Sequence, residues 1–125
     1  MKIDKNILIM SKFPKRVISH FDETFNTFKL YEQVDKEKYL ADVSEKIDGI
    51  AVMGPTIVSG KIINSIPNLK IIGNFGVGFD AIDIAKASEA NVMVTNTPNV
   101  LNDEVADTAV ALTLSVYRRI IDANH

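Results

Sequence analysis

Short apolar runs that recur along the chain are the sequence feature that most constrains its fold. Each has the length and residue types of a β-strand, and runs that are apolar nearly throughout are typical of strands buried on both faces of a parallel sheet. The sequence therefore predicts five parallel strands. They are expected at NILIM (6–10), TFKLYE (27–32), GIAVM (49–53), LKIIGN (69–74) and NVMVTN (91–96).

Segments with helical signals separate these runs. Asp35 and Ser59 are expected to cap helices, and another short helix begins at Asp80 or Asp83. Strands that alternate with helices predict right-handed crossovers, and hence a doubly wound α/β domain with no internal repeat or linker. The expected helices are 14–25, 36–47, 60–66, a short one ending at 90, and a long final helix from about 102 to 121.

Composition excludes several classes of protein. The chain has 125 residues, which is enough for one core, and its net charge of −2 offers no electrostatic attraction to nucleic acid or to an anionic membrane. It has no cysteine, and its two histidines, His20 and His125, lie at opposite ends, so no metal site is expected. No apolar run approaches the roughly 20 residues of a membrane span, and the amino terminus does not resemble a signal peptide. We expect a soluble, cytoplasmic protein.

A glycine-rich loop follows the fourth strand. Gly76, Gly78 and Ala81 match a loose dinucleotide-binding fingerprint. Three features count against a dinucleotide site: the next strand ends in Asn96 rather than in an acid, acidic residues begin the following helix, and the loop is not on the first strand. The same glycines permit positive φ angles, and their N–H groups could form a small nest that suits a carboxylate. A turn that only lets the backbone pass closely over its neighbour remains an alternative.

Several spaced motifs resemble those of the D-isomer-specific 2-hydroxyacid dehydrogenases, in the same order. They are PNLKII (67–72), GVGFD (76–80), VTNTPNVL (94–101) and VADTAVALTL (105–114). The likeness is best to the glyoxylate/hydroxypyruvate and hydroxyphenylpyruvate reductase branch, and residues 1–66 agree in layout rather than in motif. The resemblance implies a flavodoxin-like substrate domain over 1–101, and a crossover helix over 102–125 that leads to a separate Rossmann domain.

The resemblance also implies roles for residues. The backbone of Val77 and Gly78, with Gly76, would receive the substrate carboxylate, and the segment containing Met53 and Gly54 would line the substrate side of the cleft. Leu101 and Asn102 are candidate contacts to the cofactor, NAD or NADP. The catalytic Arg, Glu and His and the true NAD(P) loop would belong to the Rossmann domain, so we expect this chain alone to be inactive.

The residues at two positions restrict the class of substrate that we expect. Phosphoglycerate-specific relatives place arginines around this cleft, whereas the matching positions here are Met53 and Asn74. Without an arginine to bind the phosphate through two hydrogen bonds, a phosphorylated substrate would be held weakly. Met53 and Phe75 offer apolar surface instead, which favours glyoxylate, hydroxypyruvate or an aryl 2-oxo acid. Simple core packing is the alternative role for both side chains.

Other polar residues have plainer explanations. His20, Asp22 and Glu23 fit a solvated helix face, and His125 fits a frayed terminus. Arg118 and Arg119 fit the favourable interaction of cations with the end of a helix.

Two other classes of protein are alternative interpretations of this sequence. A phospho-receiver domain is set aside, because it needs acids after the first and third strands, where this chain has MSK (10–12) and MGP (53–55). A stand-alone 2-oxo-acid-binding or self-associating module remains open. Apolar residues nearly surround the last helix, so it predicts homo-oligomer formation if it is exposed. They form two stripes, one of Val105, Ala109, Leu112, Val116 and Ile120 and the other of Val110, Leu114, Tyr117 and Ile121.

Overall fold

The computed structural model describes residues 2–120 and 122. Its centre is a parallel sheet of five strands in the order β2-β1-β3-β4-β5. This order and the parallel pairing confirm the predicted doubly wound, flavodoxin-like architecture. The strands are β1 (Asn6–Ile9), β2 (Asn26–Lys29), β3 (Gly49–Met53), β4 (Ile71–Phe75) and β5 (Met93–Thr95).

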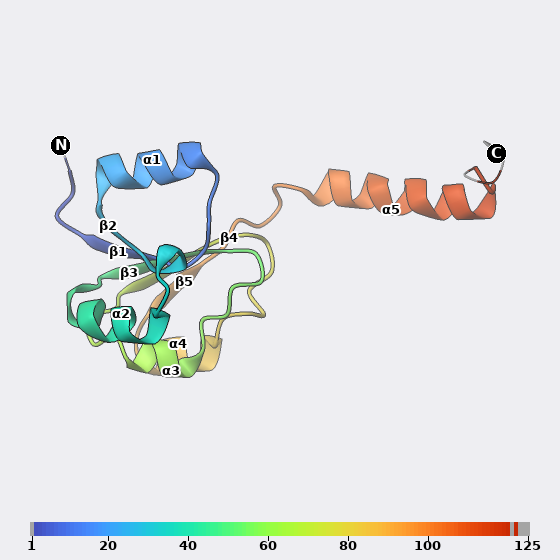
Figure 1. Cartoon of the computed structure of the whole chain (residues 1–125). Helices are drawn as coiled ribbons and strands as arrows, with labels where there is room; N and C mark the ends of the chain where they lie inside the picture. Colours follow the sequence, from blue (N-terminus) through green and yellow to red (C-terminus); the bar gives the residue numbers. More distant parts are fainter. Residues whose placement is uncertain (1, 121, 123–125) are drawn as a thin grey trace.

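Helices cover the two faces of the sheet unequally. Figure 1 shows α1 alone on one face, α2, α3 and α4 on the other, and α5 projecting away from the domain. The α-helices are α1 (Lys15–Thr24), α2 (Lys36–Val43), α3 (Gly60–Asn64), α4 (Ile84–Glu89) and α5 (Asn102–Tyr117), and short 3₁₀ turns occupy Leu30–Glu32 and Ser44–Lys46. Among the described residues no helix is long and apolar enough to span a membrane.

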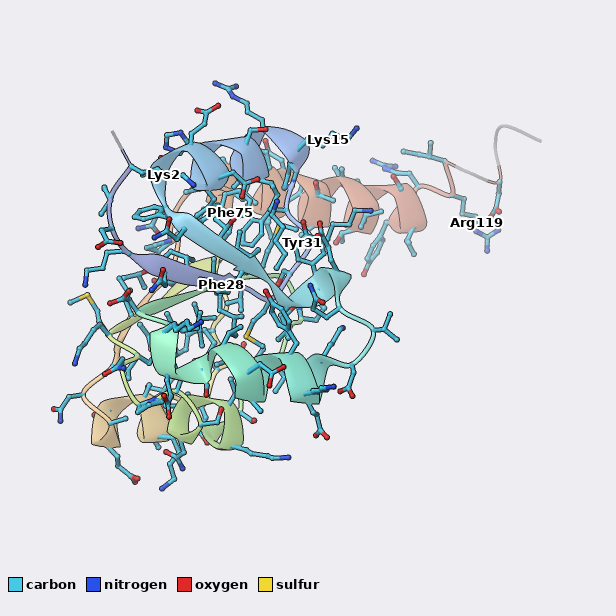
Figure 2. The ribbon with its side chains drawn as sticks, turned by 60° about the vertical axis from the view of Figure 1, so that its left-hand side comes forward. Lys2, Lys15, Phe28, Tyr31, Phe75 and Arg119 are labelled. Carbon is cyan, nitrogen blue, oxygen red and sulfur yellow. The ribbon has the colours of Figure 1, made fainter. Side chains whose placement is uncertain are left out.

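The core has two parts, one on each face. The larger part lies under α2, α3 and α4 and is built around Leu8, Ile50 and Ile72. The smaller part lies under α1, where Ile9 and Ala51 of the sheet meet Phe13. Figure 2 labels Phe28 on β2 and Tyr31 in the following turn, which pack against the larger and the smaller part respectively. Burial of apolar surface stabilises each part by roughly 25 cal/mol for every Å² removed from water. This is the main stabilising contribution in such a domain.

Side-chain caps fix where three of the helices begin. Asp35 accepts a hydrogen bond from the N–H of Lys38, and Ser59 accepts one from Ile62, as the sequence predicts. Asp83, not Asp80, caps α4, because its carboxylate accepts the N–H of Lys86.

Several boundaries differ from those expected. The predicted strand 27–32 ends at Lys29, and Leu30 is buried at the start of a 3₁₀ turn instead. The fourth and fifth strands are shorter than their apolar runs, and Asn91 has a φ of 56°, which is incompatible with a strand. The last helix ends at Tyr117, whereas its predicted end, Ile121, lies outside the described residues.

The expectation that all strands are buried on both faces is wrong for β4 and β5. The exposure of their side chains alternates along each strand: Ile72 is fully buried and Val94 partly buried, while Ile71 is 38% exposed and Met93 is 62% exposed. The physical reason is that α1 covers only the β2, β1 and β3 side of its face. An apolar side chain in a parallel strand is buried only where a helix covers it.

We expect Asp48 to make the stability of the fold depend on acid pH. Its carboxylate accepts the N–H of Asn6 and the ammonium group of Lys5, both at 2.9 Å. The hydrogen bond from Asn6, then that from Lys5, lowers the pKa of this carboxyl below its ordinary value of 3.8. Its stabilisation is therefore complete above the unfolded pKa and is lost as the pH falls through the native one.

Asp48→Ala should lower the free energy of unfolding by about 1 kcal/mol at pH 7, since the ammonium group of Lys5 is largely solvated. Urea unfolding of the variant and the wild type, at pH 7 and at about pH 3, measures this difference in unfolding free energy. The difference between variant and wild type should shrink at the lower pH, and a constant difference would contradict the role of the charge.

Candidate functional site

A cavity of about 510 Å³ opens at the carboxyl ends of β3 and β4, where ligands bind in doubly wound sheets. It brings together all seven residues predicted to contact the substrate. It is lined by Met53, Gly54, Asn74, Phe75, Gly76, Val77 and Gly78, with Pro55, Asp80 and Ala81 completing the wall.

The buried hydroxyl group of Ser11 holds in place the turn after β3, which forms one wall of the cavity. Ser11, which follows β1, accepts the N–H of Met53 at 2.8 Å, and its own hydroxyl reaches Oγ1 of Thr56, also at 2.8 Å. Thr56 in turn donates to the carbonyl of Met53 at 3.2 Å. Within this turn Gly54 has a φ of 66°, a left-handed conformation that most residue types with a side chain adopt only at a cost. The end of β1 thus fixes the turn that follows β3.

The glycine loop is held through its carbonyl groups. Asn74 is buried, and its Nδ2 donates to the carbonyl of Gly78 at 2.7 Å. Asn96 donates from Nδ2 to the carbonyl of Val77 at 2.8 Å, and the N–H of Thr97 donates to the carbonyl of Gly76 at 2.9 Å. Three successive carbonyls are therefore bound to groups that follow β5 or belong to β4. The loop conformation is fixed from inside the protein.

The amide groups of the same loop are left unpaired. Within the part of the chain that the structure describes, the N–H groups of Val77 and Gly78 donate to no protein acceptor. The positive φ angles that these glycines permit are not adopted, because neither Gly76 nor Gly78 has a positive φ. The donors are nevertheless present beside the cavity. Unpaired N–H groups are suitable partners for an anion.

The charge around the cavity is sparse. Asp80 is the only charged residue that lines it among the described residues, and no cation does. Pairing with Lys29 lowers the pKa of Asp22 and raises that of Lys29, but both lie at the end of α1 and in β2, away from the cavity. An anion would be held here by backbone dipoles, against the charge of Asp80.

The structure leaves most of the residues that were given no part in the site exposed on the surface. His20 and Glu23 are exposed on α1, and Arg118 caps the carboxyl end of α5 with Arg119 just beyond it. Asp22 is an exception: it bonds to Thr27 and Lys29 and so joins α1 to β2. His125 lies outside the described residues.

Sequence reasoning missed the residues that support the site. Ser11, Thr56 and Asn96 act by long-range hydrogen bonds, and no local spacing marks such partners. The only signal was their position, since each follows a strand at the carboxyl edge of the sheet.

The described residues do not fit a dinucleotide. No acid follows β5, where Thr95 and Asn96 stand, and the loop leads to Asp80 and to the Asp83 cap before the short α4 begins. Carboxylates at that point oppose a pyrophosphate. Leu101 and Asn102 lie exposed at the start of α5 and do not line the cavity. Their contact with a cofactor stays a prediction. No cluster of metal-ligating side chains occurs among the residues described.

We expect Asn74→Ala to loosen the glycine loop. The substitution leaves the carbonyl of Gly78 without its donor and removes a buried amide, which should cost about 1–3 kcal/mol of unfolding free energy. Hydrogen exchange of the amides at 76–79 should also accelerate. Asn68→Ala is the matched control, because Asn68 donates to the carbonyl of Glu45 at the same 2.7 Å but on the exposed surface. Equal effects of the two substitutions would refute the role of Asn74.

Comparison with known proteins places the chain among dehydrogenases. The family model described as D-isomer specific 2-hydroxyacid dehydrogenase, catalytic domain, matches residues 7–123. Hydroxyphenylpyruvate reductase from Plectranthus scutellarioides is 34% identical over 118 residues, which cover 94% of this chain and 38% of that protein. The chain thus spans about two fifths of the length of such relatives.

Solved structures agree with this. The 2-hydroxyacid dehydrogenase from Ketogulonicigenium vulgare Y25 superposes with a TM-score of 0.89 at 38% identity, over 99% of this chain and 39% of the other. The NADPH-dependent glyoxylate/hydroxypyruvate reductase from Sinorhizobium meliloti, solved with NADP and malonate, gives a TM-score of 0.71 at 33% identity, over 90% and 34% of the two chains. The cavity and the loop described above lie within the region that is similar.

Proposed function

The chain belongs to the D-isomer-specific 2-hydroxyacid dehydrogenase family, and we propose that it is the substrate-binding part of an NAD(P)-dependent reductase. The complete enzyme would reduce a small 2-oxo acid to a D-2-hydroxy acid. Residues 1–101 would form the substrate domain, and residues 102–125 the crossover to a Rossmann domain. The expected cytoplasmic location stays a prediction.

The observation that carries this proposal is the unpaired pair of N–H groups on Val77 and Gly78. They stand beside a cavity of about 510 Å³, the size of a small-molecule site. Because Asn74 and Asn96 hold the neighbouring carbonyls, the donors are preorganised. A preorganised N–H pair binds a carboxylate without the cost of reorganising the loop. Gly76, Gly54 and Met53 would shape the wall around it.

The side chains around the cavity favour a substrate without phosphate. In the described part of the chain no lysine or arginine lines the cavity, so a dianionic phosphate would lack the cations that usually bind it. Met53, Phe75 and Val77 give the cavity an apolar wall, and Phe75 is labelled in Figure 2. The ring centroids of Phe75 and Phe13 lie 6.3 Å apart. We propose glyoxylate, hydroxypyruvate or an aryl-pyruvate as substrates, and note that a relative binds malonate, a small carboxylate.

The catalytic groups would come from outside this chain. Reduction of a 2-oxo acid adds a hydride to the carbonyl carbon and a proton to its oxygen, so it needs a hydride donor and a proton donor. Among the residues that the structure describes, no histidine, lysine, tyrosine or cysteine lines the cavity. By family resemblance an Arg, a Glu and a His of the Rossmann domain, with NAD or NADP bound there, would supply this chemistry.

We expect a 2-oxo acid, but not NADH, to reach the glycine loop. An NMR titration of the ¹⁵N-labelled chain with glyoxylate or hydroxypyruvate should shift the amide signals of Val77 and Gly78. The methyl ester of the same acid is the control, since it keeps the size but lacks the carboxylate. Equal shifts with acid and ester, or shifts of these amides by NADH at micromolar concentration, would overturn the proposal.

The chain by itself should show no reductase activity. Mixed with NADH or NADPH and glyoxylate, it should oxidise the cofactor no faster than buffer does, as followed by absorbance at the nicotinamide band. Measurable turnover that survives purification would show that the catalytic groups are within these residues. A full-length relative assayed in parallel confirms that the substrates are competent.

A second proposal concerns the chain as a module without catalysis. It would bind a 2-oxo acid and self-associate through α5. The specific observation is the exposure of that helix, in which Leu112 and Leu114 are 63% and 53% exposed and Val116 is 76% exposed. Exposed apolar surface of this extent marks an interaction site.

A further inference from the structure

A second cavity, which we call the helical groove, opens between α2 and α3. Its apolar lining is Met10, which follows β1, the buried Leu30, Leu40 of α2 and Ile62 of α3. Figure 1 shows these two helices on the face of the sheet opposite α1. The groove has a volume of about 520 Å³, and no described residue lines both it and the cavity at the glycine loop. It therefore has the size of a small-molecule site and is separate from the site described above.

The interior of the groove offers a ligand apolar surface but few free hydrogen-bonding groups. Met10, Leu40 and Ile62 are only partly buried, although each packs against the larger part of the core. The two hydroxyl groups that line the groove are used by α3 itself: Ser59 accepts the N–H of Ile62, and Ser65 donates to the carbonyl of Ile62. The body of a ligand must therefore be apolar, because a polar group inside the groove would lose its hydrogen bonds to water.

Positive charge predominates at the rim of the groove. Lys36, Glu37 and Lys61 line it, so two cations stand against one carboxylate. Within the described part of the chain Lys36 forms no ion pair. Lys61 pairs with Glu37 at 3.5 Å, from one helix to the other, but the two side chains are 87% and 91% exposed. A pair as exposed as this contributes little free energy, so its lysine can turn to another anion at little cost.

We propose that the helical groove binds a small amphipathic monocarboxylate, with its alkyl or aryl body between α2 and α3 and its carboxylate at Lys36 and Lys61. The single excess positive charge at the rim matches one carboxylate rather than a doubly charged phosphate. The methylene stems of the two lysines add apolar surface beside the body of the ligand. This site does not depend on the function proposed for the cavity at the glycine loop.

Octanoate is the probe that tests the proposal, because it has an apolar body, one carboxylate and no 2-oxo group. Titrated into the full chain labelled at the methyl groups of Ile, Leu and Met, it should shift the signals of Leu40 and Ile62 until they saturate. Octanol is the matched ligand without the charge, and it should bind at least threefold more weakly. Equal affinities for the acid and the alcohol, or the lack of a saturating shift, would overturn the proposal.

Substitutions separate the charged and the apolar parts of the site. Lys36→Gln should weaken the binding of octanoate about threefold and leave that of octanol unchanged, whereas Lys38→Gln, on the same helix but outside the groove, should change neither. Ala41→Phe should fill the groove and abolish the binding of both ligands. Its control is Ala85→Phe on α4, since both alanines are exposed and only Ala41 lines the groove. Equal effects of the two substitutions within either pair would contradict the assignment.

The same spectra distinguish other occupants of the groove. If octanoate shifts the amide signals of Val77 and Gly78 but not the methyl signals of the groove, its carboxylate is bound by the glycine loop instead. If the methyl signals shift with protein concentration alone, a second copy of the chain occupies the groove. Either result would overturn the proposal. Saturating shifts at Leu40 and Ile62 would support it whether or not a 2-oxo acid reaches the glycine loop.

Discussion

The hydrogen bond from the side chain of Asn74 to the carbonyl of Gly78 is the interaction on which the candidate site depends. Asn74 is paired in register with Val52 in the middle of the sheet, and its neighbour Ile72 is fully buried. The position of the amide is therefore set by the core rather than by the loop. Through the side-chain amide of Asn74, the close packing of the core helps to determine the positions of the N–H groups of Val77 and Gly78.

Local signals in the sequence were sufficient for most of the fold. Apolar runs and the caps at Asp35 and Ser59 predicted the order of elements, because both depend on residues within a few positions. The same reasoning failed at β4 and β5. A run such as LKIIGN shows that its side chains are apolar, but whether Ile71 is covered depends on a helix elsewhere in the chain.

The candidate site was predicted to a similar extent. Its position followed from the rule that parallel strands present their carboxyl ends together, and the residues lining the cavity followed from family motifs. The roles within it did not. Asn74 was expected to contact the substrate; it lines the cavity, and its side-chain amide also holds the loop, which was not predicted. Ser11 carried no signal other than its position after a strand, since its partners are more than forty positions away.

The turn at Gly54 has a consequence for the chemistry of the cavity wall. Nothing lies within 4 Å of where a side chain would begin, so space does not exclude a larger residue there, yet the φ of 66° would strain an ordinary L residue. The restriction is therefore one of handedness rather than of size. A chain assembled by chemical synthesis with D-alanine at this position would match the backbone's preference, and the mirror-image residue would stiffen the turn that an ordinary alanine would strain.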